Sequence, residues 1–90
     1  DLYLCVLDEE SVEEAEKMAG DLRSDGVRVV VDTTLRKIAK QIKVAEKKSI
    51  RHFACVGSDE IKSGKLSLKN IKTRDESQVP IKKIAKKITS

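Results

Sequence analysis

Apolar and polar positions follow one another along the chain in blocks that predict five strands. Residues 2–7 are continuously apolar, which is typical of a strand buried on both faces. Residues 27–31, mostly β-branched, and residues 52–56 have the same character. Residues 66–69 alternate between apolar and polar, which indicates a strand with one less buried face, and a short strand is expected around 77–79.

Three stretches repeat apolar residues at helical spacing. The first helix is expected over residues 12–24, with Ser11 and Glu14 as a capping-box pair at its start. The second is expected to begin after the helix-start cluster at residues 32–34. The third begins at Pro80, which suits the first turn of a helix. The apolar stripe of the second helix comprises Leu35, Ile38, Ala39, Ile42 and Ala45.

The order of these elements predicts an α/β fold. Strand–helix–strand units cross over with a right hand and make parallel pairs, and the last two strands follow as a hairpin pair. We expect helices on both faces, hence a three-layer α/β/α sandwich. The glycine-bracketed residues 57–65 are interpreted as a connection between two strands. One domain is expected over residues 1–90, excised from a longer protein because the chain does not begin with Met.

Charge is distributed unevenly over the 90 residues. Ten of the 15 acidic residues lie in residues 1–33, whereas 16 of the 19 Lys and Arg residues lie in residues 34–90. This polarisation favours a basic surface that faces a polyanion, with a solvated lysine-rich surface as the alternative. Aromatic residues are only 2% of the chain, which excludes an aromatic platform for single-stranded nucleic acid. No apolar run approaches the ~18 residues of a membrane span, so no membrane partner is expected.

Candidate catalytic and metal-binding residues are few. Cys5 and Cys55 lie in apolar runs, without a CxxC motif or a Cys/His cluster, so no metal site is expected. Both are predicted to be buried, unbridged thiols on neighbouring strands, which fits a cytosolic protein. His52 is the only histidine, and nothing in the sequence orients it toward a nucleophile. We therefore expect no catalytic residue and no cofactor in this chain.

Two acidic residues, Asp8 and Glu9, follow the first strand. They fit a supporting role at the start of the first helix, where carboxylates interact favourably with the helix dipole. The alternative is the acidic pair of a receiver-type signalling domain. Such a domain needs an aspartate at the end of its third strand, and here that position is Gly57.

The segment after the third strand carries a family resemblance. Its Gly57-x-x-Glu60 motif, then Gly64 and Leu66-x-Leu68-Lys69, is similar to the signature of the anticodon-binding domain of class IIa aminoacyl-tRNA synthetases. Residues 26–32 and 35–45 are also similar to that family. The similarity covers nearly the whole chain.

Within that family the chain most resembles the histidyl branch. Residues 40–45, Lys-Gln-Ile-Lys-Val-Ala, and residues 68–73 carry this likeness. Ser49 stands where the family usually has Gly at the end of the second helix, and the turn at residues 73–78 is longer than usual. Both departures lie in connections, so they concern the shape of loops rather than the fold.

The resemblance implies a five-stranded mixed sheet with the fourth strand antiparallel, flanked by three helices. It also implies that the domain binds the unstacked anticodon bases of tRNA. Its anticodon contacts are expected at Glu60, Lys69 and Gly57, and its tRNA backbone contacts at Lys40, Lys43 and Gln41. Glu60 can accept hydrogen bonds from a guanine edge, and lysines on the second helix suit phosphates, which contribute affinity without sequence information.

The resemblance further implies a cytoplasmic, homodimeric parent protein that joins an amino acid to tRNA with ATP and Mg²⁺. This chain alone is expected to bind tRNA and not to be an enzyme. The alternative is a regulatory or accessory module derived from the same domain, which senses tRNA or mediates protein association without aminoacylation. Class II catalytic motifs upstream of this chain, or another kind of domain there, would separate these two hypotheses.

Overall fold

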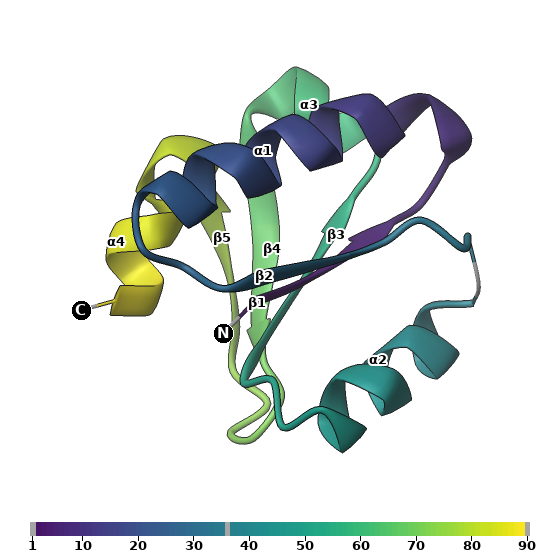
Figure 1. Ribbon diagram of the computed structural model, residues 1–90, viewed down its shortest axis with the longest axis vertical. Coiled ribbons are helices and arrows are strands. Elements are labelled where there is room, and N and C mark those ends of the chain that lie inside the picture. The colour runs from purple at the N-terminus through teal and green to yellow at the C-terminus, as the bar shows by residue number, and fades with distance from the viewer. Residues whose placement is uncertain (1, 36, 90) are drawn as a thin grey trace.

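Five strands form a single mixed sheet in the computed structural model, which describes residues 2–35 and 37–89 (Figure 1). Their spatial order is β2-β1-β3-β4-β5. β1 pairs in parallel with both β2 and β3, whereas β4 is antiparallel to β3 and to β5. The expected mixed sheet with an antiparallel fourth strand is therefore confirmed. The strands are β1 (Leu2–Val6), β2 (Val29–Asp32), β3 (His52–Val56), β4 (Lys65–Asn70) and β5 (Glu76–Pro80).

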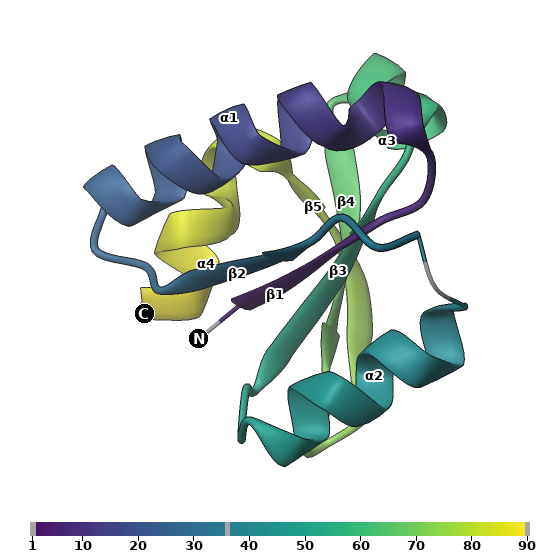
Figure 2. The ribbon, with the colours of Figure 1, turned by 45° about the vertical axis from the view of Figure 1, so that its right-hand side comes forward.

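Helices cover both faces of this sheet, which confirms the three-layer arrangement. α1 and α4 pack on one face and α2 on the other (Figures 1 and 2). The connection between β3 and β4, interpreted from the sequence as a plain loop, contains the additional short helix α3. The helices are α1 (Val12–Ser24), α2 (Ile38–Lys47), α3 (Ser58–Ser63) and α4 (Ile84–Thr89), and two 3₁₀ turns, η1 (Glu9–Ser11) and η2 (Ile81–Lys83), precede α1 and α4.

The strand β1 is buried along its whole length and divides the core in two. Leu2, Leu4 and Val6 face the larger cluster, beneath α1 and α4. Tyr3 and Cys5 point the other way, into a smaller cluster with Phe53 and Ala45 beneath α2. The continuous apolar run at the start of the chain thus reflects two buried faces, because alternate side chains of a strand point to opposite sides.

A hydrogen bond to Asp32 holds the α2 side of the sheet together. The Tyr3 ring stacks on Phe53, with ring centroids 5.7 Å apart, and its hydroxyl donates to the Asp32 carboxylate on the neighbouring strand. The other carboxylate oxygen accepts from the backbone N–H of Thr34 at 2.9 Å and from the Thr34 hydroxyl at 2.5 Å. Asp32 is only 8% exposed, so these partners replace the water that it loses.

These bonds also explain why the second helix starts later than the sequence predicts. Asp32 forms an Asx turn with Thr34 instead of capping a helix at that point. The chain then passes through Leu35 in a left-handed conformation (φ 59°), and α2 begins only at Ile38. Leu35 is 45% exposed, Ile38 is 44% exposed and Ala39 is exposed as well, so the assignment of these three to the buried stripe is wrong.

The first helix also starts differently from the capping-box prediction. Ser11 already has helical backbone angles, and its side chain does not cap α1. Instead, the Asp8 carboxylate accepts from the Ser11 backbone N–H at 2.9 Å and from its hydroxyl at 2.6 Å. These bonds lower the pKa of Asp8, with the Ser11 hydroxyl as the largest cause. The supporting role expected for Asp8 is therefore confirmed. Asp8 caps the turn that precedes α1, one turn before Ser11, which was the expected cap.

The second helix ends at a strained residue. Ser49 has a φ of 58°, and its N–H donates to the Glu46 carbonyl at 3.0 Å. The next N–H, of Ile50, donates to the Ala45 carbonyl at 3.0 Å. This pattern is a helix stop that favours glycine, because other residues pay a steric cost in the left-handed region. The departure of Ser49 from the family pattern is thus a matter of backbone strain.

We expect Tyr3→Phe to lower the free energy of unfolding by about 1–3 kcal/mol. The variant keeps the stacked ring but leaves a buried carboxylate oxygen without its donor. Urea denaturation followed by circular dichroism measures the effect. Ser24→Ala is the matched control, because the Ser24 hydroxyl bonds the Gly20 carbonyl on the exposed side of α1. Equal losses for both variants would contradict a special role for Tyr3.

We expect Ser49→Gly to raise the free energy of unfolding by about 0.5–1 kcal/mol. The relief of left-handed strain exceeds the extra entropy that glycine loses on folding. Ser49→Ala is the control, because alanine removes the hydroxyl and keeps the strain. The same denaturation experiment tests both variants, and a glycine variant no more stable than the alanine variant refutes the explanation.

Candidate nucleic-acid interface

Polar side chains of β3, β4 and β5 line an accessible part of the sheet on its α2 side. Leu66 and Leu68 point into the larger core, so the residues between and after them point to the α2 side. The register pairs Lys69 with Phe53 and with Glu76, and Ser67 with Gln78. We call this surface the β4 face; its members, all half-buried or exposed, are Cys55, Ser67, Lys69, Glu76 and Gln78.

Gly57 and Glu60 sit at one end of the β4 face, where β3 passes into α3. Gly57 is the N-cap of α3, and Glu60 is the third residue of that helix. A Cβ atom at Gly57 would lie 3.1 Å from Leu7 Cδ1 and 3.4 Å from a carboxylate oxygen of Glu60. A side chain at this position would therefore press on Leu7, whereas its distance from Glu60 is that of an ordinary contact.

The turn after α3 brings Lys69 to the same surface. Gly64 ends α3 in the left-handed conformation (φ 72°) and starts β4. The charges of Glu60 and Glu76 act to raise the pKa of Cys55 and that of Lys69 acts to lower it, so all three lie within electrostatic reach of this thiol. Glu60 and Lys69 therefore both lie within electrostatic reach of Cys55.

The residues expected to contact the tRNA backbone lie on α2, and they divide by exposure. Lys40 and Lys43 are exposed, and they belong to a row of cations on the outer surface of the helix. Gln41 is fully buried (0% exposed), because it lies one turn from Ala45 on the inner stripe of α2. The assignment of Gln41 to the tRNA backbone is therefore wrong for this conformation. The exposed lysines of this row are Lys37, Lys40, Lys43, Lys47 and Lys48.

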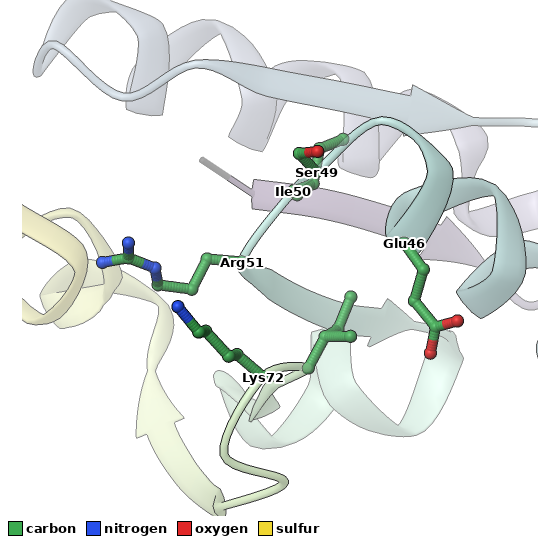
Figure 3. A pocket seen from close by; sticks show the side chains of 6 residues that line it. Glu46, Ser49, Ile50, Arg51 and Lys72 are labelled. Carbon is green, nitrogen blue, oxygen red and sulfur yellow. The ribbon is translucent and has the colours of Figure 1, made fainter.

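Sequence reasoning missed a cavity at the opposite end of β3. It has a volume of about 290 Å³ and lies where α2, the start of β3 and the end of β4 meet (Figure 3). Apart from Glu46 in α2, its residues belong to connections rather than to a motif, so the only sequence signal was the unusual Ser49. The lining residues are Glu46, Ser49, Ile50, Arg51, Ile71 and Lys72.

Comparisons with known proteins agree with this geometry. The family of anticodon binding domains matches residues 1–90, the whole chain. The chain belongs to this family. The chain is 33% identical over 84 residues to the histidine–tRNA ligase of Lactococcus lactis subsp. lactis and 38% identical over 73 residues to that of Methanococcus maripaludis. These matches cover 93% and 81% of the chain.

The solved structures include histidyl-tRNA synthetase from Nostoc sp. PCC 7120, with a TM-score of 0.90 and 27% identity over 97% of this chain. The RNA-binding domain of threonyl-tRNA synthetase from Cryptosporidium parvum, at 19% identity and a TM-score of 0.88, shares the fold. The chain spans about a fifth of the length of the curated relatives it matches. The chain is therefore an anticodon-binding domain that is similar to the corresponding part of histidine–tRNA ligases.

Metal sites, the single histidine and membrane-spanning helices are the other features that the sequence predictions concern. Among residues 2–35 and 37–89, no group of three or more His, Cys, Asp and Glu residues could hold a metal ion. His52 starts β3 as expected, and burial lowers its pKa. No helix in the described part of the chain is long and apolar enough to cross a membrane.

The two cysteines differ in exposure more than the sequence predicts. Cys5 and Cys55 are register partners on the parallel strands β1 and β3, and neither is bridged. Cys5 is fully buried, as expected, but Cys55 is only half-buried because it faces the accessible β4 face. A hydrogen bond between the thiols raises the pKa of Cys5 far above its usual value and lowers that of Cys55. The prediction of unbridged thiols on neighbouring strands is confirmed, and the prediction that Cys55 is buried is wrong.

We expect iodoacetamide to modify Cys55 first in the native domain and Cys5 only after unfolding. The thiolate is the reactive form, and both exposure and the lowered pKa favour it at Cys55. Mass spectrometry of digested protein, sampled over time and between pH 6 and pH 9, identifies the order. The native Cys55→Ser variant should react slowly with iodoacetamide, because its remaining thiol, Cys5, is buried. Early modification of Cys5 would contradict the assignment.

Proposed function

We propose that this domain binds the anticodon loop of a tRNA on its β4 face. The observation that supports the proposal is the place of Lys69 on the accessible β4 face, opposite Phe53, with Glu60 at the end of that face in α3; both charges act on Cys55. An ionised Glu60 only accepts hydrogen bonds, and Lys69 only donates them. Together they match the polar edges of bases that have left the stack, which is how proteins read single-stranded RNA loops.

The lysine row of α2 supplies the electrostatic part of this binding. Lys40 and Lys43 are exposed on the same side of the sheet as the β4 face. Contacts with phosphates position the RNA and raise affinity for every sequence, whereas contacts with base edges discriminate. Binding energy and specificity therefore come from different elements, α2 for the former and the α3–β4 segment for the latter.

We further propose that the parent protein is a histidine–tRNA ligase that aminoacylates tRNA with ATP and Mg²⁺. The supporting facts are the curated relatives, which are histidine–tRNA ligases four to five times as long as this chain. We also propose that the parent is a homodimer in the cytoplasm. The two unbridged cysteines support a reducing compartment.

We expect Glu60→Gln and Lys69→Met each to weaken binding of the histidine tRNA anticodon hairpin by about 1–3 kcal/mol. Both should affect a hairpin with a changed anticodon much less, because each variant removes a base-edge contact. Lys43→Gln should weaken both hairpins equally and lower the slope of log affinity against log salt by about 1, as loss of a phosphate contact does. Titration by fluorescence anisotropy at several salt concentrations measures all three.

Matched controls lie on the other side of the sheet. Glu13→Gln and Lys82→Gln change the same types of charge on α1 and η2 and should leave both hairpins bound as before. The proposal fails if Glu60→Gln weakens both hairpins alike or neither of them. Circular dichroism of each variant confirms that the fold is intact.

A further inference from the structure

The cavity at the start of β3 has the form of a small binding site. Its volume of about 290 Å³ lies at the small end of ligand pockets, which begin at about 300 Å³. Glu60 follows the C-terminal end of β3, whereas Arg51 precedes its first residue. The five residues of β3 therefore separate the cavity from Glu60 by about 16 Å, at ~3.3 Å per residue.

The floor and walls of the cavity are held by the surrounding structure. Ile50 and Ile71 are half-buried and pack against the cluster of Tyr3 and Phe53, so each leaves part of its apolar surface in the cavity. The Ile71 N–H donates to the Arg51 carbonyl at 2.8 Å, which ties the end of β4 to the start of β3.

The loop that carries Lys72 is equally well anchored. The side-chain oxygen of Asn70 accepts from the backbone N–H groups of Lys72 at 3.0 Å and Thr73 at 3.1 Å. Hydrogen bonds within the chain therefore hold the backbone that carries Arg51, Ile71 and Lys72.

Charges of opposite sign flank this floor. Figure 3 shows the Glu46 side chain on one side of the cavity and the side chains of Arg51 and Lys72 on the other. Within the described residues, no ion pair joins either cation to a carboxylate. Two neighbouring cations without a counter-charge favour an anion between them, and both arginine and lysine bind phosphate well.

We propose that this cavity binds one guanine nucleotide of an RNA single strand, with its phosphate on Arg51 and Lys72. The base lies on Ile50 and Ile71, and its edge reaches Glu46. A carboxylate only accepts, so it selects a base that offers two adjacent donors, as guanine does with N1–H and its exocyclic amine. An acidic peptide suits the cations equally well but meets repulsion from Glu46.

This proposal rests on the proposed function, because it extends the RNA surface along β4. Ile71 lies two residues beyond Lys69, so both point to the α2 side of the sheet. A strand of RNA that places one base at Glu60 and Lys69 can therefore continue along β4 toward the cavity. The domain then reads two separate bases, one at each end of β3, instead of one.

Nuclear magnetic resonance of the ¹⁵N-labelled 90-residue chain tests the cavity without any tRNA. The probes are GMP, IMP, guanosine and inorganic phosphate. We expect GMP to shift the amide signals of residues 49–51 and 71–73. IMP, which lacks the exocyclic amine, should bind about fivefold more weakly or worse, and so should guanosine, which lacks the phosphate.

Variants assign each half of the nucleotide to its side chains. Glu46→Gln should abolish the preference for GMP over IMP. Arg51→Gln with Lys72→Gln should reduce GMP binding to the level of guanosine. The controls are Glu13→Gln and the pair Lys82→Gln with Lys83→Gln, which carry the same charge changes outside the cavity. The amide spectrum of each variant reports directly whether the fold is retained.

The proposal is overturned if GMP shifts no signals at the cavity, or if phosphate alone gives the same shifts with no preference among bases. Failure of the anticodon proposal looks different. If Glu60→Gln leaves the hairpin discrimination intact while GMP still binds at Glu46 and Arg51, the β4 face is not the reading surface but the cavity stands. If GMP shifts no signals at the cavity while Glu60→Gln still removes the discrimination between hairpins, the β4 face is the reading surface and the cavity proposal fails.

Discussion

Burial of β1 on both faces is the constraint on which the rest of this domain depends. All five of its residues are buried, three beneath α1 and α4 and two beneath α2. Neither helix layer could pack without it, because β1 supplies the centre of both cores. Its one hydroxyl group, that of Tyr3, bonds Asp32 at the end of β2. That bond satisfies the buried polar atoms and sets where the chain leaves the sheet toward α2.

The strand β3, on one side of β1, connects the two candidate binding surfaces. β3 leads into Gly57 and Glu60 at one end and follows Ile50 and Arg51 at the other. Its antiparallel pairing with β4 fixes Lys69 beside Phe53, and with it the whole β4 face. A shift of one residue in this register would turn Lys69 into the larger core and expose Leu68. The burial of the core thus determines which side chains of β4 reach the surface.

The two longest helices carry charges of opposite sign. Most acidic residues belong to the first third of the chain, and many of them lie on the outer surface of α1. The lysine row of α2 lies on the other side of the sheet, next to the β4 face. The charge of α2 therefore attracts a polyanion, and that of α1 repels one. In the proposed function, α2 attracts the RNA and the neighbouring β4 face contacts its bases.

The sequence by itself determined the strands, the main helices and their layering, because burial leaves a period of two or 3.6 in the pattern of apolar residues. It also placed Glu60 and Lys69 through a motif. Only the tertiary structure decided the outcomes at Leu35, Gln41 and Cys55. Asp32 has a partner 29 residues away and so delays α2, the neighbours of α2 bury Gln41, and the open side of β4 leaves Cys55 accessible. Each of these three outcomes depends on contacts between segments that are distant in the sequence, and the local spacing of apolar residues cannot predict such contacts.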